Sequence, residues 1–202
     1  MTIYVTSDLH FSHQRIVEFT DRPWTAEENN EKLIELWNSQ VGPKDTVYHL
    51  GDFIFAGPKR QQEAFDILTR LNGQKYLMYG NHCHINMWNI LQSREDWYKA
   101  NAIHLGYYYE LKMDRKTVCM MHYPILNWNK KHYGAYMLHG HQHGAFPDPT
   151  DERRMDVGLD AHPETRFYTW DEIRAKLDAI PKPCQDHHGR PWKNGREVTE
   201  ND

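Results

Sequence analysis

Two short runs near opposite ends of the chain each carry two potential metal ligands separated by one residue. Asp8-Leu9-His10 follows the first apolar segment, and Gly140-His141-Gln142-His143 lies far downstream. In an extended segment, side chains at positions i and i+2 point the same way, so each run is expected to direct two ligands at one point. A fold that uses both runs must bring them together around a common site.

Three further islands lie between these runs, in the order Gly51-Asp52, Gly80-Asn81-His82 and His122. Carboxylate, amide and imidazole groups without thiolates suit divalent transition metals such as manganese, iron, zinc, nickel or cobalt. Two such ions held side by side are characteristic of many hydrolytic enzymes. We therefore expect two divalent transition-metal ions, with manganese as the first choice. The candidate ligands are Asp8, His10, Asp52, Asn81, His122, His141 and His143.

The composition argues against a protein that coats nucleic acid or membranes. The chain has 202 residues and a formal net charge of −4, so no global basic field attracts polyanions. No apolar stretch approaches the ~20 residues that span a bilayer, and no signal-peptide pattern follows the first methionine. The three cysteines do not suggest a disulfide framework. We expect a cytoplasmic protein without membrane contact, and nothing in the sequence sets its oligomeric state.

The first half of the chain alternates predicted strands and helices. Strands are expected at residues 3–7, 45–50 and 75–79, and each ends on candidate ligands. Helices are expected at residues 25–40, with a capping box formed by Thr25 and Glu28, and from Pro58 to Leu71. Because ligands cluster at the carboxyl ends of strands in open α/β sheets, this placement supports a site independently of residue type.

The second half predicts another sheet. Residues 103–113 and 117–122 are expected to pair antiparallel around a turn at residues 114–116, followed by strands at 135–139 and 155–157 and a helix at 170–179 capped by Thr169 and Glu172. From Pro181 the chain is polar and rich in charge. We expect an α/β protein with a single domain at residues 1–180 and a polar C-terminal tail or extension at 181–202.

In this order the five islands resemble the motifs of the calcineurin-like metallophosphoesterase superfamily, and the match spans residues 8 to 143. The Asp-x-His-x-x-His start, which includes His13, is similar to that of small single-domain members from bacteria and phages. The resemblance implies a β-sandwich of two mixed sheets flanked by helices (α/β/β/α).

The resemblance also implies roles for the residues. Asp8, His10 and His143 would bind one metal, Asn81, His122 and His141 the other, and Asp52 would bridge them. His82 would protonate the leaving oxygen or stabilise the transition state. The implied protein is a binuclear metal-dependent phosphoesterase that hydrolyses a phosphodiester or phosphomonoester, with a small nucleotide-like substrate favoured, by attack of a metal-bridging hydroxide.

Two departures from the family pattern bear on this interpretation. Many members place an acid three residues after the bridging Asp or directly after the catalytic His, where this chain has Phe55 and Cys83. Such an acid orients its histidine and raises the basicity of the ring, so the prediction for His82 lacks its usual support. The Arg of the serine/threonine protein phosphatase motif is also absent from residues 53–57, which argues against a protein phosphatase.

Candidate substrate contacts are fewer. Trp128, Lys130 and Lys131 lie in the loop between His122 and His139, where they would stack a base and pair a second phosphate, although solvated loop charges are the commoner explanation. His13 would support the site or simply cap a local segment. Two alternatives remain: a nuclease acting on single-stranded nucleic acid, which the charge balance does not indicate, and a non-catalytic metal-binding interaction module.

Overall fold

The first sheet places three ligand-bearing loops along one edge. The computed structural model describes residues 1–182, 192–193 and 196–197. The strand order of this sheet is β4-β3-β2-β1-β9. Strands β1 to β4 pair in parallel, and β9 pairs antiparallel with β1. The strands are β1 (Ile3–Thr6), β2 (Thr46–His49), β3 (Gln74–Met78), β4 (Ala102–Gly106) and β9 (Tyr168–Thr169).

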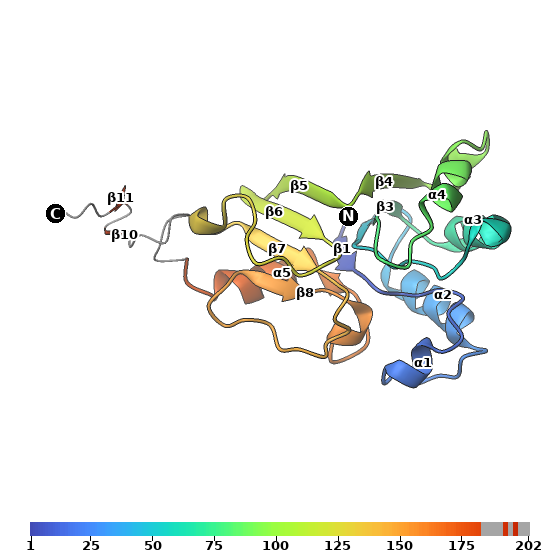
Figure 1. The fold of residues 1–202 in the computed structure, drawn as a ribbon, viewed down its shortest axis with the longest axis horizontal. Coiled ribbons are helices and arrows are strands. Elements are labelled where there is room, and N and C mark those ends of the chain that lie inside the picture. Colours follow the sequence, from blue (N-terminus) through green and yellow to red (C-terminus); the bar gives the residue numbers. More distant parts are fainter. Residues whose placement is uncertain (183–191, 194–195, 198–202) are drawn as a thin grey trace.

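A second sheet of four strands has the order β5-β6-β7-β8. Strands β5 and β6 form an antiparallel hairpin, whereas β7 and β8 add in parallel. The strands are β5 (Tyr108–Met113), β6 (Lys116–Met121), β7 (Tyr136–His139) and β8 (Arg154–Asp156). A separate short pair, β10 (Trp192–Lys193) and β11 (Arg196–Glu197), lies beyond them (Figure 1).

Alternating strand residues divide the core into two main layers. Val47 and Leu77 face a cluster built with the helices, whereas their neighbours Tyr48 and Met78 face the second sheet. This period of two follows from the pleat. Val118, Met120, Tyr136, Leu138 and Met155 supply the other side of the layer between the sheets. The two sheets therefore pack face to face.

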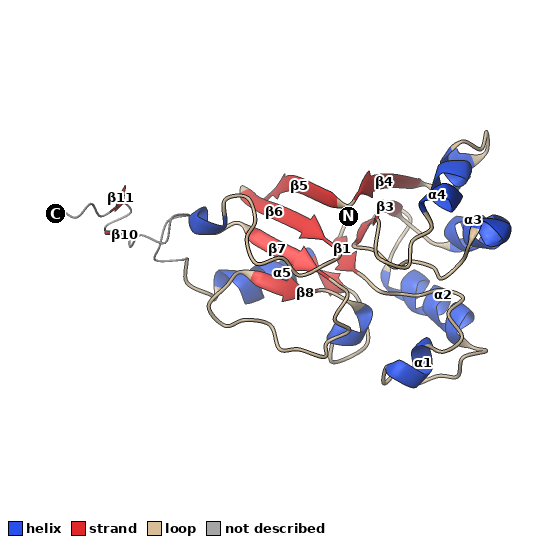
Figure 2. Cartoon of the chain, in the orientation of Figure 1, coloured by secondary structure: helices blue, strands red, loops and turns tan. Residues whose placement is uncertain are grey.

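Helices cover the outer face of the first sheet (Figure 2). Trp37 of α2, Leu68 of α3 and Trp88 of α4 are at most 1% exposed, and fully burying one such side chain contributes ~1.5–3 kcal/mol. The helix α5 instead extends the layer between the sheets through Ile173 and Leu177. The helices are α1 (Ile16–Phe19), α2 (Asn29–Gln40), α3 (Gln61–Arg70), α4 (Ile85–Gln92) and α5 (Trp170–Asp178), with 3-10 turns η1 (Pro58–Arg60), η2 (Trp97–Ala100), η3 (Lys131–Tyr133) and η4 (Leu159–Ala161).

The predicted two mixed sheets flanked by helices are confirmed, and so are the first three strands and the capping box of Thr169 and Glu172. The single strand predicted at residues 103–113 is wrong. At Gly106 the backbone has φ +85, and the chain changes sheets there, so β4 pairs with β3 and only β5 pairs with β6. A left-handed residue interrupts an extended strand, and Gly adopts that conformation at no steric cost.

Smaller differences concern element ends. The helix predicted from Thr25 begins at Asn29, although the Thr25 backbone N–H and hydroxyl both donate to the Glu28 carboxylate as the capping pattern requires. Helix α4 and strand β9 were not predicted. Most of the predicted tail at 181–202 lies outside the described residues. None of the helices in the described part of the chain is both long enough and apolar enough to cross a bilayer.

Candidate metal centre

Backbone hydrogen bonds align the loops that follow β1 and β2. The Asp8 and His10 amides donate to the carbonyls of Gly51 and Asp52, at 3.1 and 2.9 Å. Because β1 and β2 run in parallel, their carboxyl ends lie at the same edge of the sheet. This pairing brings the Asp8-Leu9-His10 run against Asp52, although 44 residues separate Asp8 from Asp52 in the sequence.

The ligand-bearing backbone is left-handed, which corrects the expectation of extended segments. Positive φ angles occur at Asp8 (61), His10 (51), Asp52 (54), His141 (72) and His143 (49). Non-glycine residues rarely adopt this conformation, and each instance stores of order 1–3 kcal/mol of strain that the surrounding structure must offset. Alternate residues still direct their side chains inward, but tight loops produce this convergence rather than the pleat of a strand.

Three glycines precede ligands because a side chain would occupy the ligands' space. A Cβ atom on Gly80 would overlap the Asp52 carboxylate, and one on Gly140 would overlap the carboxylate of Asp8. At Gly51, which has φ +109, it would meet His122 Nδ1 at 2.6 Å. The glycines of the Gly-Asp, Gly-Asn-His and Gly-His-x-His islands therefore leave the space that the neighbouring candidate ligands occupy.

The first group of residues that could hold a metal ion is Asp8, His10 and His143, whose donor atoms all lie within 4.8 Å of one another. Asp8 Oδ1 is 3.8 Å from the Nε2 atoms of both His10 and His143, and the two imidazoles stack at 5.2 Å between ring centroids. The other carboxylate oxygen of Asp8 accepts the His141 amide at 2.8 Å. One end of β1 is thereby joined to the Gly-His-x-His loop after β7.

The second group is Asp8, Asp52 and His122. His122 Nε2 lies 3.3 Å from Asp52 Oδ2 and 2.8 Å from Asn81 Oδ1. The ring of His141 lies beside that of His122, with centroids 5.2 Å apart. Asp52 Oδ2 is also 3.8 Å from His10 Nε2. All seven predicted ligands therefore meet in one cluster, and Asp52 lies between the histidines of its two halves.

The donor atoms fit metal ions. Asp8 and His10 are at most 2% exposed, yet Asp8 Oδ1 and both ring nitrogens of His10 have no hydrogen-bond partner in the described part of the chain. A buried polar atom without a partner costs free energy. Oxygen and imidazole donors of this kind bind divalent transition metals, and a bound ion would supply the missing partner.

The electrostatics favour charged carboxylates at the centre. Burial by itself raises the pKa of Asp8, but the neighbouring His10, His122 and His143 side chains outweigh burial and lower the pKa overall. The pKa of Asp52 is lowered in the same way, against burial, chiefly by the neighbouring His122 side chain, whose Nε2 atom lies 3.3 Å from Asp52 Oδ2. Both groups are therefore ionised at neutral pH, as metal ligands must be.

Two residues that the sequence did not indicate hold the centre from behind. Asp160 Oδ2 accepts a hydrogen bond from His143 Nδ1 at 2.7 Å. The buried Arg22 forms two hydrogen bonds with Asp160, at 2.8 and 3.0 Å, and donates to the carbonyls of Asp8 and Leu9. A carboxylate on the far nitrogen of a metal-binding histidine fixes the ring's tautomer and orientation.

Asp156 and His49 are structural. The Asp156 carboxylate accepts backbone N–H groups from Gly144 and Gly158, which ties the Gly-His-x-His loop to the residues after β8. His49 is fully buried on β2, and burial lowers its pKa to about 3.

His82 stands on the open side of the cluster. Its backbone N–H donates to Asp52 Oδ1 at 2.8 Å, and its ring lies 5.4 Å from the His10 ring. Phe55, which stands at a position where the family pattern has an acid, lies beside His82, and the centroids of the two rings are 5.5 Å apart. Desolvation is the main cause that lowers the pKa of His82.

Cys83 is a packing residue. Its sulfur accepts a hydrogen bond from the Gly80 amide, and burial raises the pKa of the thiol.

The structure does not support the predicted substrate contacts of the 128–131 loop. Trp128 is 6% exposed, and its indole N–H donates to the Ala135 carbonyl, so the ring cannot stack on a base. The Lys131 ammonium pairs with Glu152 at 2.5 Å. Lys130 lines a separate basic cleft beside Arg115, Lys116 and Lys182. His13, in contrast, lies next to the cluster, with its ring 5.6 Å from that of His10.

The family profile of calcineurin-like phosphoesterases matches residues 1–194. The chain belongs to the calcineurin-like phosphoesterase family. Members of this family bind divalent metals, and the Asp and His clusters described above are able to hold them.

Similar sequences occur in mycobacterial phages and in an archaeon. The Gene 66 protein of Mycobacterium phage D29 is 29% identical over 205 residues and aligns with 88% of this chain and 96% of its own length. An uncharacterized protein of Methanocaldococcus jannaschii is 43% identical over 81 residues, which is 40% of this chain and 46% of that protein. The crystal structure of a protein of unknown function from Aquifex aeolicus shares the fold, with a TM-score of 0.62, 18% identity and coverage of 86% and 98% of the two chains.

Proposed function

We propose that this protein is a binuclear metal-dependent phosphoesterase that hydrolyses a small nucleotide-like phosphodiester or phosphomonoester. The observation that carries the proposal is the position of Asp52, whose Oδ2 atom lies 3.8 Å from His10 Nε2 and 3.3 Å from His122 Nε2. A carboxylate between two imidazoles from opposite halves of the cluster suits a ligand shared by neighbouring ions. In this assignment Asp8, His10 and His143 hold one ion, and Asn81, His122 and His141 hold the other.

The formal charge of the loaded site attracts an anionic ester. Two divalent ions contribute +4 against the two carboxylates of Asp8 and Asp52, and the amide of Asn81 adds no charge. When bound, such ions lower the pKa of a coordinated water, orient the phosphoryl oxygens and offset charge in the transition state. The buried face of the cluster, formed by Asp8, His10, Asp52 and His122, excludes solvent, so the ester enters from the exposed side at Asn81 and His82.

His82 is assigned the proton transfer to the leaving group. In hydrolysis the oxygen of water bonds to phosphorus, the bond from phosphorus to the ester oxygen breaks, and that oxygen takes a proton. The His82 ring is exposed beside the cluster, and its backbone is fixed by Asp52. Positioned acids of this kind contribute roughly 10²–10⁴-fold in rate.

Turnover of bis-p-nitrophenyl phosphate and p-nitrophenyl phosphate tests the proposal. We expect hydrolysis of at least one substrate with Mn²⁺, loss of activity after chelation, and loss in Asp52→Asn at unchanged fold. Metal binding without turnover of either ester or of a single-stranded oligonucleotide would instead support a non-catalytic metal-binding module. Cleavage of the oligonucleotide alone would make the protein a nuclease.

A further inference from the structure

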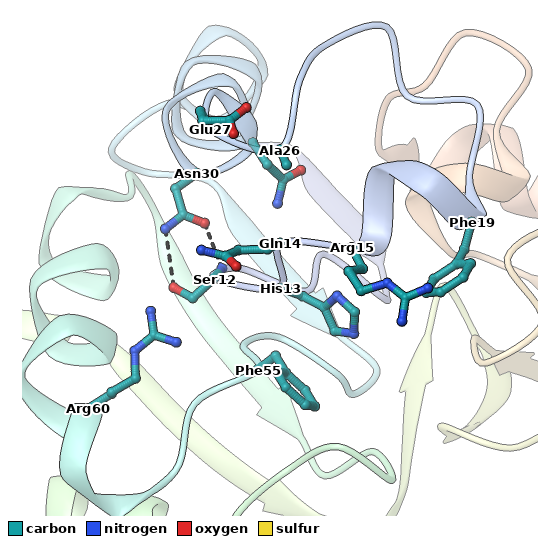
Figure 3. A pocket seen from close by; sticks show the side chains of 11 residues that line it. Ser12, His13, Gln14, Arg15, Phe19, Ala26, Glu27, Asn30, Phe55 and Arg60 are labelled. Carbon is teal, nitrogen blue, oxygen red and sulfur yellow. Dashed lines mark hydrogen bonds between the residues drawn. The ribbon is translucent and has the colours of Figure 1, made fainter.

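A cleft of about 680 Å³ opens beside the candidate metal centre (Figure 3). It lies between the loop after His10, the start of α2 and the turn η1 that leads into α3. His13 and Phe55 form its inner end. Their rings are 4.5 Å apart, and both neighbour His82, at 6.3 and 5.5 Å. An ester bound at the metals therefore has room to extend one arm past His13 and Phe55 into this space.

The size of the cleft indicates the size of that arm. Sites that enclose whole small molecules have volumes of about 300–1,000 Å³. Inorganic phosphate or a methyl ester would fill only the metal end and leave the cleft empty. A substrate that uses the cleft therefore carries a group much larger than an alkyl chain of a few atoms.

The walls of the cleft suit a planar group with polar edges. Phe55 is 42% exposed, and Phe19, over whose ring the Arg15 guanidinium lies at 5.0 Å, is 63% exposed, so aromatic side chains are exposed at both ends of the cleft. Gln14 and Glu27 also line the cleft, and in the described part of the chain neither side chain has a hydrogen-bond partner. An exposed aromatic face binds a base by stacking, while an open amide and carboxylate match the hydroxyl and amino groups of a nucleoside.

The charge of the cleft argues against a polyanionic ligand. Its two guanidinium groups already have partners, because Arg15 pairs with Glu18 at 2.9 Å and Arg60 with Glu63 at 2.6 Å. The carboxylates of Glu18, Glu63 and Glu27 therefore outnumber the two guanidinium groups. A nucleic-acid backbone or a polyphosphate needs unpaired cations along its path, whereas an uncharged nucleoside does not.

One wall of the cleft is joined by side-chain hydrogen bonds in the absence of a ligand. Ser12 has φ +63, and its backbone N–H donates to Asn30 Oδ1 at 2.6 Å. Its hydroxyl donates to Glu63 Oε1 at 2.5 Å, and Asn30 Nδ2 donates back to that hydroxyl at 3.1 Å, as Figure 3 shows. A preformed wall lowers the entropic cost of binding.

We infer that this cleft binds the nucleoside arm of the substrate, with the base stacked on Phe55 and the phosphate at the metal centre. The inference rests on the proposed function and narrows its substrate class to nucleotide esters. It also gives a role to Phe55, whose ring lies 5.5 Å from that of His82.

Calorimetric titration of the Mn²⁺-loaded protein with thymidine 5′-monophosphate and with methyl phosphate tests the inference. The two probes share a phosphate and differ in the nucleoside, so the ratio of their Kd values isolates the cleft. We expect the nucleotide to bind about tenfold tighter or more, and Phe55→Ala to reduce that ratio about fivefold or more, because the variant removes the aromatic ring on which the base stacks. Phe55→Trp should retain the ratio.

Tyr98→Ala is the matched control, because Tyr98 is an aromatic residue 75% exposed outside the cleft; the ratio should not change. Equal Kd values for the two probes, or a ratio that Phe55→Ala leaves intact, would overturn the inference. Turnover of bis-p-nitrophenyl phosphate by the same preparation separates the two proposals. Turnover with equal Kd values removes only the nucleoside cleft, whereas a retained ratio without turnover of any ester removes the proposed function.

Discussion

Asp160 accepts a hydrogen bond from His143 Nδ1 at 2.7 Å and so directs Nε2 of that ring toward Asp8. Arg22 holds the other side of Asp160 and binds the backbone of the Asp8-Leu9-His10 loop. The two ligand runs at opposite ends of the sequence are thereby linked by a buried ion pair. Replacing one partner of such a pair leaves the other charge uncompensated.

Asp160→Asn should weaken metal binding, because an amide does not hold the imidazole in the required tautomer as a carboxylate does. Loss of a carboxylate behind a metal-binding histidine typically reduces metal affinity about 10–100-fold. Calorimetric titration with Mn²⁺ measures the change. Asp171→Asn is the control, since the Asp171 side chain is 83% exposed on α5. Equal Mn²⁺ affinity in the wild type and Asp160→Asn would show that Asp160 does not position His143.

Gly80→Ala should disrupt the centre although it adds only one methyl group. The new Cβ would overlap the carboxylate of Asp52 and lie 2.6 Å from the Asp52 amide nitrogen. Overpacking of a rigid site typically costs about 1–3 kcal/mol. Thermal unfolding and Mn²⁺ binding should both be impaired. At Gly57 the nearest atom to a Cβ is 4.0 Å away, so Gly57→Ala should resemble the wild type, and equal behaviour of the two variants would refute this account.

Removing the His82 ring should slow the hydrolysis of esters with poor leaving groups more than that of esters with good leaving groups. Desolvation lowers the pKa of His82 below its ordinary value, so its protonated fraction, and the rate that depends on it, decreases as pH rises through that lowered pKa. For the wild type we expect a shallow dependence of rate on leaving-group pKa, and for His82→Ala a steep one. Alkyl and aryl phosphodiesters compared across pH 5–8 provide the measurement. A steep dependence already present in the wild type would exclude His82 as the acid.

His104 should make the protein less stable in acid. It lies on β4 away from the metal centre, and desolvation lowers its pKa to about 4. Because the folded state holds the ring neutral while the unfolded chain protonates near the ordinary value, the unfolded state binds more protons between pH 6.5 and about 4. As the pH is lowered through this window, the free energy of unfolding therefore decreases, by up to ~1.4 kcal/mol per pH unit from this group.

His104→Asn should reduce that slope, because the amide oxygen can accept the Gly106 N–H in place of Nδ1 without taking up a proton. Denaturant titrations at pH 7, 6, 5 and 4 give the slopes of both proteins. Parallel pH profiles would mean that His104 is not the group responsible.

The sequence was sufficient to predict that the candidate ligands lie together, because they follow strand ends in a fixed order. It did not reveal the left-handed backbone at Asp8, His10 and Asp52, since tertiary hydrogen bonds rather than local propensity impose that conformation. Asp160 was missed for a related reason. It is 17 residues from His143 and 138 from Arg22, and no local pattern joins residues so far apart.

The boundary between the sheets was also hidden. Residues 103–113 read as one extended run, and only the positive φ of Gly106 sends β4 and β5 to different sheets. Trp128 was misjudged because an aromatic residue in a loop near the centre resembles a stacking platform, whereas in the structure it packs under the loop with Cys119 and Met137. Burial of that ring depends on contacts between segments that the sequence does not place side by side.

The most direct test of the central claim is anomalous diffraction from crystals grown with Mn²⁺. We predict two peaks ~3.5–4 Å apart, on either side of Asp52, with His10 and His143 near one peak and His122 and His141 near the other. A single peak, or two peaks that do not share Asp52, would contradict a binuclear centre built from these residues.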